Sequence, residues 1–351
     1  IHVMKMCEAF AKLKYDINLY TVNHQNLKKI NKNYNINNKF RIHSIFDRAI
    51  KLNLLYRIIF SLKILFKKTN IDALFISRSI IFSLLASIIR KNVILELHHE
   101  ITGFSKIIYF TLKKLNLIKN LKYILLNKNL NKIYKIKKNN FLILDDAVNI
   151  DDFKVNKSLK YKKTCVYIGS FFEGKGVEQI FRLAKINKNI TFHIYGEKKF
   201  LNEKIKINNV KVFDYITYNK VPKILSKYEI ALMPYQSKVK GRSSINLERY
   251  MSPLKMFDYL AARMIIVASN LKVYKHILKD GFNCKLIKIN EDKIWSDTIM
   301  KIIRNKINKS KFKKNAYKTA INNTWEKRCV KIVNFFYKEK KFDFNNNICG
   351  R

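Results

Sequence analysis

The sequence has few of the residues that interrupt secondary structure or cross-link a chain. Its 351 residues include only 8 Gly, 3 Pro and 5 Cys. So few Gly and Pro leave little room for flexible or proline-rich linkers, and a largely folded protein is expected. The cysteines, at 7, 165, 284, 329 and 349, form no C-x-x-C pair, which argues against a zinc ribbon or a small disulfide framework. This cysteine usage fits a reducing compartment, and we expect the cytoplasm.

Long apolar runs and acidic residues are also scarce. The longest uncharged apolar stretch, Ser79–Ile89, is far shorter than the roughly 20 residues that span a bilayer, so no membrane-spanning helix is predicted. Asp and Glu total 25 against 71 Lys and Arg, a net charge of +46. Such a charge attracts polyanions and admits nucleic acid, anionic membranes and phosphorylated substrates. The excess is spread along the whole chain, however, and a nucleotide composition that favours Lys, Asn and Ile codons explains it without any partner.

What the sequence does contain is a repeated alternation of short apolar strands with helices, and 48% of its residues are hydrophobic. This alternation predicts parallel sheets covered on both faces. The strand candidates are Asp16–Thr21, Ile71–Ile76, Val93–Leu97, Tyr123–Leu126 and Phe141–Leu144, and then Val166–Ile168, Ile190–Tyr195, Val210–Phe213, Ile230–Met233 and Ile265–Ala268. We therefore predict an α/β protein with two Rossmann-like doubly wound domains that face each other across a cleft, with ligands at the carboxyl ends of the strands.

The predicted domains are residues 1–155 and 164–310, joined by a polar, Lys-rich linker. A helical region over 311–340, which includes Trp325 and can pack back on the first domain, and a tail over 341–351 complete the chain. Apolar residues from Val3 to Leu13 already have helical spacing, whereas a parallel α/β domain normally begins with a strand. We expect that the first strand and its loop are missing, because of a truncated or misannotated start.

The most informative segment begins at Ser252. Ser252 is the side chain expected at an N-cap, and Pro253 fits the first helical position. The free amides of the first turn, with Leu254 and Lys255, would then face an anion, and a phosphate would offset the unfavourable placing of Lys255 near the helix start. Asp258 lies one turn further in, where a carboxylate can accept two hydrogen bonds from a ribose diol. An ordinary capped surface helix explains the same residues.

A second phosphate-binding element is predicted after the first strand of the second domain. Gly169 and Ser170 end that strand, and Lys175 and Gly176 open the next helix. A glycine turn lets backbone approach a diphosphate, and the lysine adds a charge. The alternative is a plain strand-to-helix turn. Gly196, after the next strand, is a further candidate for the same binding site, and a structural turn is again the alternative.

In the first domain, Glu96, His98 and His99 lie at or just beyond the end of a strand. His98 is placed to hydrogen-bond a substrate hydroxyl or to transfer a proton. A metal is not expected, because the spacing differs from a helical zinc motif and no third ligand is evident. A structural pair of histidines remains an alternative.

Two basic amphipathic stretches, Leu54–Phe66 and Ile107–Ile118, also lie in the first domain. They fit the anionic face of a membrane, and ordinary α/β helices explain them as well.

Taken together, these residues resemble retaining glycosyltransferases of family 4, also called group 1, which have the two-domain GT-B fold. The most specific segments are Ile168–Ser170, Glu173–Gly176, Tyr195–Gly196, Val221–Pro234, Ser252–Ser269, Asp280–Gly281 and Thr324–Arg328. The resemblance implies a nucleotide-sugar donor bound by the second domain and a glycan or lipid-linked acceptor bound by the first. It also implies a retained anomeric configuration, no metal, and a role in cell-surface polysaccharide or glycolipid synthesis, with the basic helices resting on the inner membrane face.

The resemblance assigns roles to three residues. Asp258 matches the acidic residue that holds the donor ribose, Lys175 the basic residue on the diphosphate, and His98 the histidine near the reacting carbon of the donor sugar. The first carboxylate that the family often carries is Tyr250 here, with Glu248 two residues out of register.

The chain departs from the family pattern in two more places. Ser170 replaces a common arginine, which leaves phosphate neutralisation to Lys175 and Arg242. Arg263 replaces a glycine after the ribose-binding helix, and it would be strained if that position needs a positive φ. Two other functions stay open. A nucleotide-sugar epimerase or phosphorylase of the same fold would bind the same donor, whereas a basic nucleic-acid-binding protein would lack support from any recognition-helix motif.

Overall fold

The computed structural model describes residues 1–23, 27–37, 39–46, 53–68, 70, 72–201, 207–240 and 248–337. Contacts within the chain divide it into two units. The C-terminal unit comprises Ile1–Lys5, Lys28–Asn37 and Asp145–Trp325, and the N-terminal unit comprises Met6–Leu27, Asn38–Leu144 and the chain from Glu326 onward. Each unit is described by itself.

The N-terminal unit is built on a parallel sheet in the order β3-β4-β5-β6. Its strands are β3 (Phe75–Ser77), β4 (Val93–Leu97), β5 (Lys122–Leu125) and β6 (Phe141–Ile143). A separate parallel pair joins β1 (Asn18–Asn23) to β2 (Arg41–Phe46). β4 is buried along its whole length and is apolar except for Glu96, which is typical of a strand covered on both faces.

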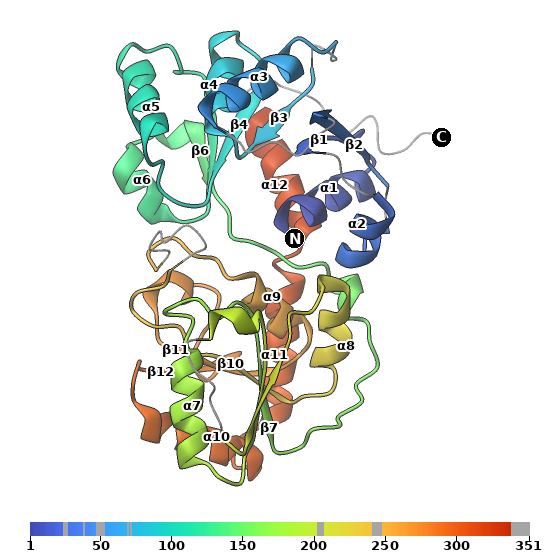
Figure 1. The fold of residues 1–351 in the computed structure, drawn as a ribbon, viewed down its shortest axis with the longest axis vertical. Coiled ribbons are helices and arrows are strands. Elements are labelled where there is room, and N and C mark those ends of the chain that lie inside the picture. The colour runs from blue at the N-terminus through green and yellow to red at the C-terminus, as the bar shows by residue number, and fades with distance from the viewer. Residues whose placement is uncertain are drawn as a thin grey trace. The chain divides into compact units, whose positions relative to one another are not determined.

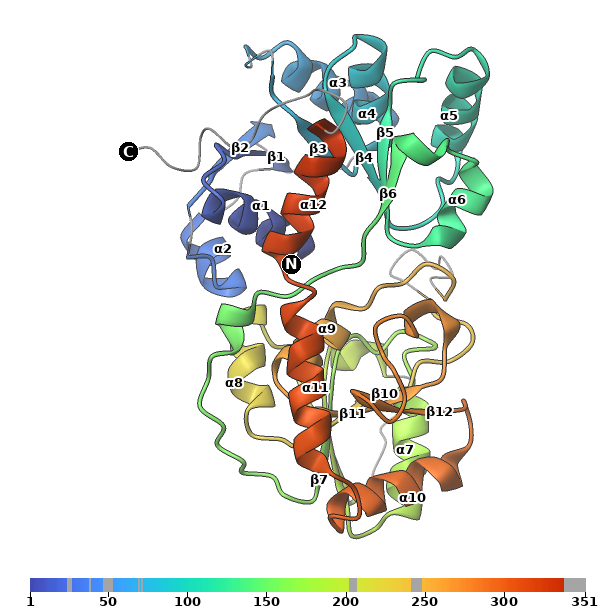
Figure 2. The same cartoon turned by 180° about the vertical axis from the view of Figure 1, so that it is seen from behind.

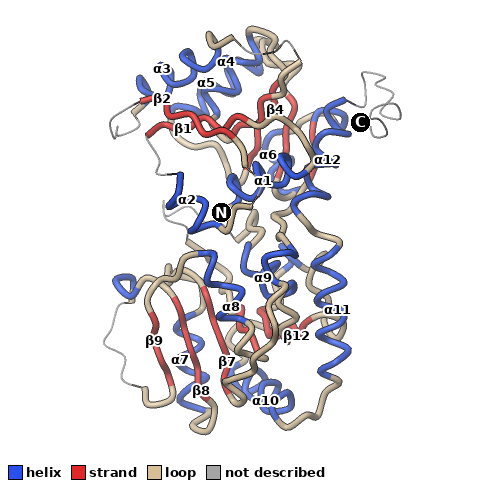
Figure 3. Tube along the Cα trace, turned by 90° about the vertical axis from the view of Figure 1, so that its right-hand side faces the viewer, coloured by secondary structure: helices blue, strands red, loops and turns tan. Residues whose placement is uncertain are grey.

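Helices cover this sheet. They are α3 (Leu54–Leu65), α4 (Ile80–Ile88), α5 (Phe104–Lys114), α6 (Lys128–Tyr134) and α12 (Trp325–Tyr337), and α1 (His2–Lys12) runs from one unit into the other. Packing contacts place α4 between α3 and α5, and the three helices lie side by side in Figures 1 and 3. From the last helix, Phe335 and Phe336 reach the Lys122 ammonium on β5, so α12 belongs to this unit (Figure 2).

The C-terminal unit has a six-stranded parallel sheet in the order β12-β11-β10-β7-β8-β9. The strands are β7 (Thr164–Ile168), β8 (Thr191–Tyr195), β9 (Val210–Phe213), β10 (Ile230–Met233), β11 (Ile265–Ser269) and β12 (Cys284–Ile287). The helices are α2 (Leu27–Tyr34), α7 (Val177–Ile186), α8 (Val221–Leu225), α9 (Leu254–Ala261), α10 (Asp292–Ile303) and α11 (Lys309–Ile321).

Successive residues of the central strands point to opposite faces of this sheet, as strand geometry requires. Ala231 and Met233 pack in the hydrophobic core with α9 and α11, whereas Ile230 and Leu232 pack in the second core with α7 and α10. The sheet is therefore covered on both faces. The predicted α/β class with parallel, doubly wound sheets is confirmed.

Two strands were not predicted, and one helical region differs from expectation. Both β2 and β12 carry charged or polar side chains among their apolar ones, so neither is a continuous apolar run. The helical stretch predicted near 311–338 is two helices, α11 and α12. The interruption arises where the chain pairs with Val148, which donates from its amide to the Asn323 carbonyl and accepts from the Trp325 amide.

The predicted linker packs on the C-terminal unit. The Tyr161 ring stacks on Tyr228 with ring centroids 4.8 Å apart, and the Lys157 ammonium donates to the Tyr228 carbonyl at 3.3 Å. Among the described residues, no helix combines the length and the apolar character needed to cross a bilayer.

Gly176 offers a test of the packing between β7 and β10. It has a φ of +87°, and a Cβ there would lie 1.9 Å from the Pro234 carbonyl oxygen. We expect Gly176→Ala to lower the free energy of unfolding by roughly 1–2 kcal/mol for the left-handed backbone and about 1–3 kcal/mol more for the clash. Chemical denaturation measures this change.

The matched control is Gly281→Ala. Gly281 also has a positive φ, +70°, but a Cβ added there would meet no atom within 4 Å. This variant should lose only the backbone contribution. Equal losses for the two variants would contradict the role of the Pro234 contact.

Candidate active site

The turn after β7 forms one wall of the candidate site. The Tyr167 hydroxyl donates to the Ser170 carbonyl at 2.8 Å, and the Ile168 amide donates to the Tyr259 hydroxyl of α9 at 2.9 Å. These bonds fix the turn, including Gly169, against the first turns of α9. The structure thus brings the two predicted phosphate-binding elements together within the C-terminal unit.

Lys255 lies over this turn. Its Nζ atom is 3.6 Å from the centre of the Tyr167 ring and 5.4 Å from that of Tyr235. A Cβ on Gly169 would be only 2.2 Å from the same Nζ, so the absence of a side chain at 169 makes room for the ammonium group. This Nζ is buried and has no hydrogen-bond partner within the described part of the chain.

Lys175 contributes a second cation to the same place. Its Nζ lies 5.1 Å from the centre of the Tyr235 ring, which Lys255 also approaches. Burial lowers the pKa of Lys175 to about 8. Burial also holds the pKa of Lys255 well below its usual range, the charge of Lys175 lowers it further, and Asp258 partly opposes both effects. Two ammonium groups that repel each other in a buried site are suited to binding an anion.

The start of α9 differs by one residue from the prediction. Ser252 was expected at the N-cap and Pro253 at the first helical position, but Pro253 is the N-cap and the helix begins at Leu254. The reason is that the Ser252 hydroxyl accepts a hydrogen bond from the Asp146 amide at 3.0 Å, and Pro253 has extended backbone angles. Since no side chain caps α9, its first-turn amides at Leu254 and Lys255 are suited to an anion.

Asp258 lies on the second turn of α9, as predicted, and is 7% exposed. The Tyr218 hydroxyl donates to its Oδ1 at 3.2 Å. Burial raises the pKa of Asp258 to about 7, and the nearby Asp152 and Asp146 raise it, whereas Tyr218 and Lys5 lower it. The carboxyl group therefore changes its charge near neutral pH.

A buried polar layer lies behind Asp258. The Lys5 ammonium is 2.8 Å from Asp152 Oδ2 and donates to the Asn35 carbonyl at 2.8 Å, while His2 Nδ1 is 2.6 Å from Asp146 Oδ1. These pairs compensate the two carboxylates that repel Asp258.

The other predicted glycines of this unit lie at the end of a helix or a strand. Gly176 is the N-cap of α7. Gly196 directly follows β8, and a Cβ there would lie 2.3 Å from the Gly169 carbonyl oxygen, so its absence permits the packing of the turn. Arg242 lies outside the described residues.

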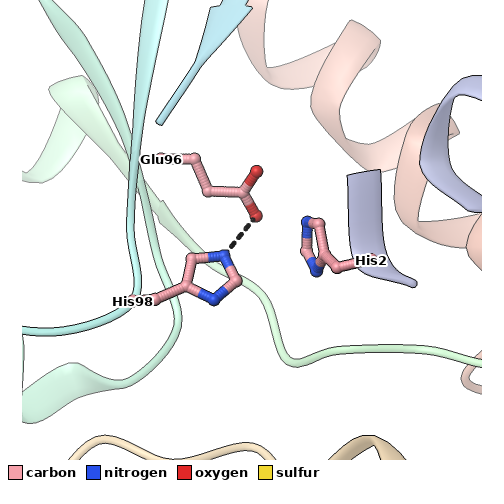
Figure 4. A group of neighbouring side chains, drawn as sticks. All are labelled: His2, Glu96 and His98. Carbon is pink, nitrogen blue, oxygen red and sulfur yellow. Dashed lines mark ion pairs between the residues drawn. The ribbon is translucent and has the colours of Figure 1, made fainter. Parts of the chain in front are cut away.

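In the N-terminal unit, His98 directly follows β4, as predicted. Its Nε2 is 3.2 Å from Glu96 Oε1, the ion pair that Figure 4 marks with a dashed line. Glu96 is 2% exposed and also pairs with Arg328 of α12 at 2.5 Å. The carboxylate thus orients the imidazole, and Arg328 compensates its charge.

Sequence reasoning missed the tyrosines of the site. Tyr167 and Tyr235 provide the rings beneath the two lysines, and Tyr218 hydrogen-bonds Asp258. With 19 tyrosines in the chain, nothing in the sequence singles these out. The expected strain at Arg263 is confirmed: its φ is +54°, and its guanidinium lies 4.0 Å from the centre of the Tyr317 ring.

Comparisons with known proteins identify the fold. Solved structures with similar folds include a glycosyltransferase from Rickettsia africae (14% identity, TM-score 0.71, covering 97% of this chain and 94% of that one). Anabaena HepE in complex with UDP and glucose is also similar (12%, 0.66, 94% and 95%), as is sucrose-phosphate synthase from Thermosynechococcus elongatus (10%, 0.66, 96% and 92%). The protein therefore has the GT-B glycosyltransferase fold.

The family comparison covers the C-terminal unit. Residues 148–319 match the family described as "Glycosyl transferases group 1". No curated protein sequence matches the chain significantly. The segment that is similar to this family contains Lys175, Lys255 and Asp258.

Because the pKa of Asp258 is raised, its carboxyl group should lower the folding stability in a pH-dependent way. Because the folded protein holds this proton to about pH 7 and the unfolded chain loses it near pH 3.8, folding stability falls as pH rises between these values. Asp258→Asn should therefore stabilise the ligand-free protein at pH 8, by at most about 4 kcal/mol, and by much less at pH 5. Thermal unfolding at both pH values measures this difference.

Asp297→Asn is the control, since Asp297 is an exposed carboxylate of the same unit. It should change neither melting temperature. A lower melting temperature for Asp258→Asn at pH 8 would contradict the buried, repelled carboxylate.

Proposed function

We propose that this protein is a retaining glycosyltransferase that moves a sugar, of the hexosyl type, from a nucleotide-sugar donor to a glycan or lipid-linked acceptor in cell-surface polysaccharide or glycolipid synthesis. The observation that carries the proposal is the meeting of Lys175, Lys255, the uncapped start of α9 and Asp258 in one unit. The UDP and glucose in the similar Anabaena structure support the choice of ligand.

In this proposal the diphosphate lies at the start of α9, between the two lysines. An anion there would compensate the repulsion of the buried ammonium groups and accept hydrogen bonds from the free amides of the helix. Asp258 would accept hydrogen bonds from the ribose diol, with Tyr218 orienting its carboxylate. Gly169 and Gly176 would keep the turn close to the ligand, with Ser170, Ser252 and Pro253 shaping its edges.

The chemistry we propose follows from this placement. As the bond between the sugar and the diphosphate breaks, negative charge grows on the departing phosphate, and fixed cations lower the energy of that transition state. Lys175 and Lys255 would supply this stabilisation without a metal ion. The departing phosphate would then help to deprotonate the acceptor hydroxyl on the same face of the sugar, which retains the anomeric configuration.

We assign the acceptor side to the N-terminal unit, with His98 contacting the donor sugar. The Glu96 carboxylate at 3.2 Å would keep the imidazole oriented for a sugar hydroxyl. We also propose a cytoplasmic location, and the buried free thiols of Cys165, Cys284 and Cys329 suit a reducing compartment.

UDP binding tests the site directly. We expect UDP to raise the melting temperature of the full chain, and Lys175→Met or Lys255→Met to weaken binding by about 10- to 100-fold, since each removes a charged partner worth roughly 1.5–3 kcal/mol. Asp258→Ala should abolish the shift. Calorimetric titration gives the affinities, and Lys185→Met on the exposed side of α7 should leave them unchanged.

The affinity for UDP should also depend on pH. It should rise as Asp258 ionises near pH 7 and fall as Lys175 loses its proton near pH 8, so the maximum lies between these values. Absence of binding by UDP and by every other nucleoside diphosphate would count decisively against the donor site.

The stereochemical assignment needs its own experiment. We expect proton NMR of the product formed from an α-linked sugar nucleotide to show an α-linked sugar with UDP released in equal amount. A β-linked product would overturn the retaining assignment, and a new sugar nucleotide formed without acceptor would favour epimerisation.

A further inference from the structure

Arg328 has an unusual position on α12. The buried face of this helix carries Trp325, Cys329 and Ile332, whose spacing is that of one apolar stripe. Arg328 lies on the same face and is only 4% exposed. An apolar side chain would pack there at lower cost, because a buried charge loses its hydration. Arg328 ends the segment Thr324–Arg328, which resembles group 1 glycosyltransferases but has no part in the donor site.

Glu96, the partner of Arg328, is also unusual for its position. The other four residues of β4 are apolar, and the whole strand is buried. The Glu96 Oε1 atom lies 2.5 Å from Nη2 of Arg328, across 232 residues of sequence. Nη1 of the same guanidinium lies 3.1 Å from Sδ of Met6 on α1, so the planar group is held from both sides. The guanidinium therefore fixes one carboxylate oxygen inside the N-terminal unit.

The same oxygen faces His98. Glu96 Oε1 is 3.2 Å from Nε2 of His98, and the second ring nitrogen, Nδ1, points away from Glu96 in Figure 4. Because a carboxylate only accepts hydrogen bonds, Nε2 carries a proton towards it. The His98 side chain is 14% exposed, against 1% for Glu96 and 3% for Arg328. The ion pair is thus shielded from water, whereas the ring remains partly accessible.

We propose that Arg328 is a positioning residue of the transferase. It holds the Glu96 carboxylate in place, and Glu96 holds the His98 ring so that Nδ1 forms a hydrogen bond with a hydroxyl of the donor sugar. This inference rests on the proposed function, in which His98 contacts that sugar. A displacement of about 1 Å in a group that contacts the substrate can cost about 100-fold in rate, so a fixed ring favours the reaction.

Stability alone does not account for the buried pair. Replacing such a pair by apolar residues of similar size often leaves a protein equally stable or more stable, whereas removing one partner is strongly destabilising. The double variant E96M/R328M therefore removes the positioning of the ring but keeps the packing of β4 against α12. In this variant a structural role and a positioning role give different results.

The first test measures UDP release from UDP-glucose, with water in place of the acceptor. For E96M/R328M we expect a melting temperature within about 5 °C of that of the unchanged protein and a kcat lower by about 10- to 100-fold. KM should change less than kcat, and the affinity for UDP should stay within about twofold. Arg328→Lys keeps the charge but not the planar fork, so its kcat should lie between those of Arg328→Met and the unchanged protein.

His98→Gln shows whether the pair acts through the imidazole. If it does, E96M/R328M should lower kcat by less than about twofold further in the His98→Gln background, because coupled residues do not contribute additively. A further loss as large as in the unchanged protein would overturn the proposal, as would an unchanged kcat in E96M/R328M itself.

Two control variants separate positioning from stability and charge. Leu84→Ala removes a side chain of α4 that is 2% exposed, and it should lower the melting temperature without lowering kcat. Lys331→Met removes an exposed cation from α12 and should change neither quantity. A loss of kcat in Leu84→Ala equal to that in Arg328→Met would show that Arg328 is only structural.

Proton NMR of the imidazole N–H groups tests the geometry without turnover. We expect the unchanged protein to show a His98 Nε2–H signal protected from exchange with water, identified by its absence in His98→Gln. The signal should disappear in E96M/R328M, and its persistence there would overturn the proposal. If the unchanged protein binds neither UDP nor UDP-glucose, the proposed function fails, and this signal alone then decides whether Arg328 positions the ring.

Discussion

The repulsion between the buried ammonium group of Lys255 and that of the half-buried Lys175 is the constraint on which the candidate site depends. Lys175 and Lys255 both approach the ring of Tyr235, and each has a lowered pKa because burial removes the water that would screen its charge. Aromatic faces offer only partial compensation. A dianionic ligand would relieve this repulsion and recover the energy as binding.

The burial of Asp258 also lowers the stability of the folded protein. A carboxylate buried beside Asp152 and Asp146 is unfavourable, and Tyr218 and Lys5 offset only part of it. The first two turns of α9 are thus less stable than they could be. The Asp258 carboxyl group has a pKa of about 7, and the Lys255 ammonium group has no hydrogen-bond partner among the described residues. Functional sites commonly accept such a loss of stability.

Apolar patterning made most of the fold predictable. Strands such as Val93–Leu97 and Ile230–Met233 were located to the residue, because buried parallel strands are mostly apolar. The edge strand Cys284–Ile287 was missed, whereas the other edge strand of this sheet, Val210–Phe213, was predicted although it also contains a lysine. The interruption between α11 and α12 was also missed, because it depends on pairing with Val148, a contact over more than 170 residues of sequence that no local pattern records.

The candidate site was predictable where backbone chemistry determines it. Glycine turns and the start of α9 have local signatures, so the elements around Lys175 and Asp258 were found. The tyrosines were not, because only the three-dimensional fold decides which of 19 rings lies beneath an ammonium group. The predicted N-cap was wrong by one residue, because the Ser252 hydroxyl accepts a hydrogen bond from a distant amide, that of Asp146.

The bare Cα of Gly169 also has a consequence for substitutions. A methyl group at 169 would occupy the space of the Lys255 ammonium, 2.2 Å away, so even the smallest replacement competes with that charge. Alanine or serine at 169 would require the flexible end of the Lys255 side chain to move away from the turn. A substitution at 169 is therefore expected to change the position of the Lys255 charge, although the two residues are 86 positions apart in the sequence.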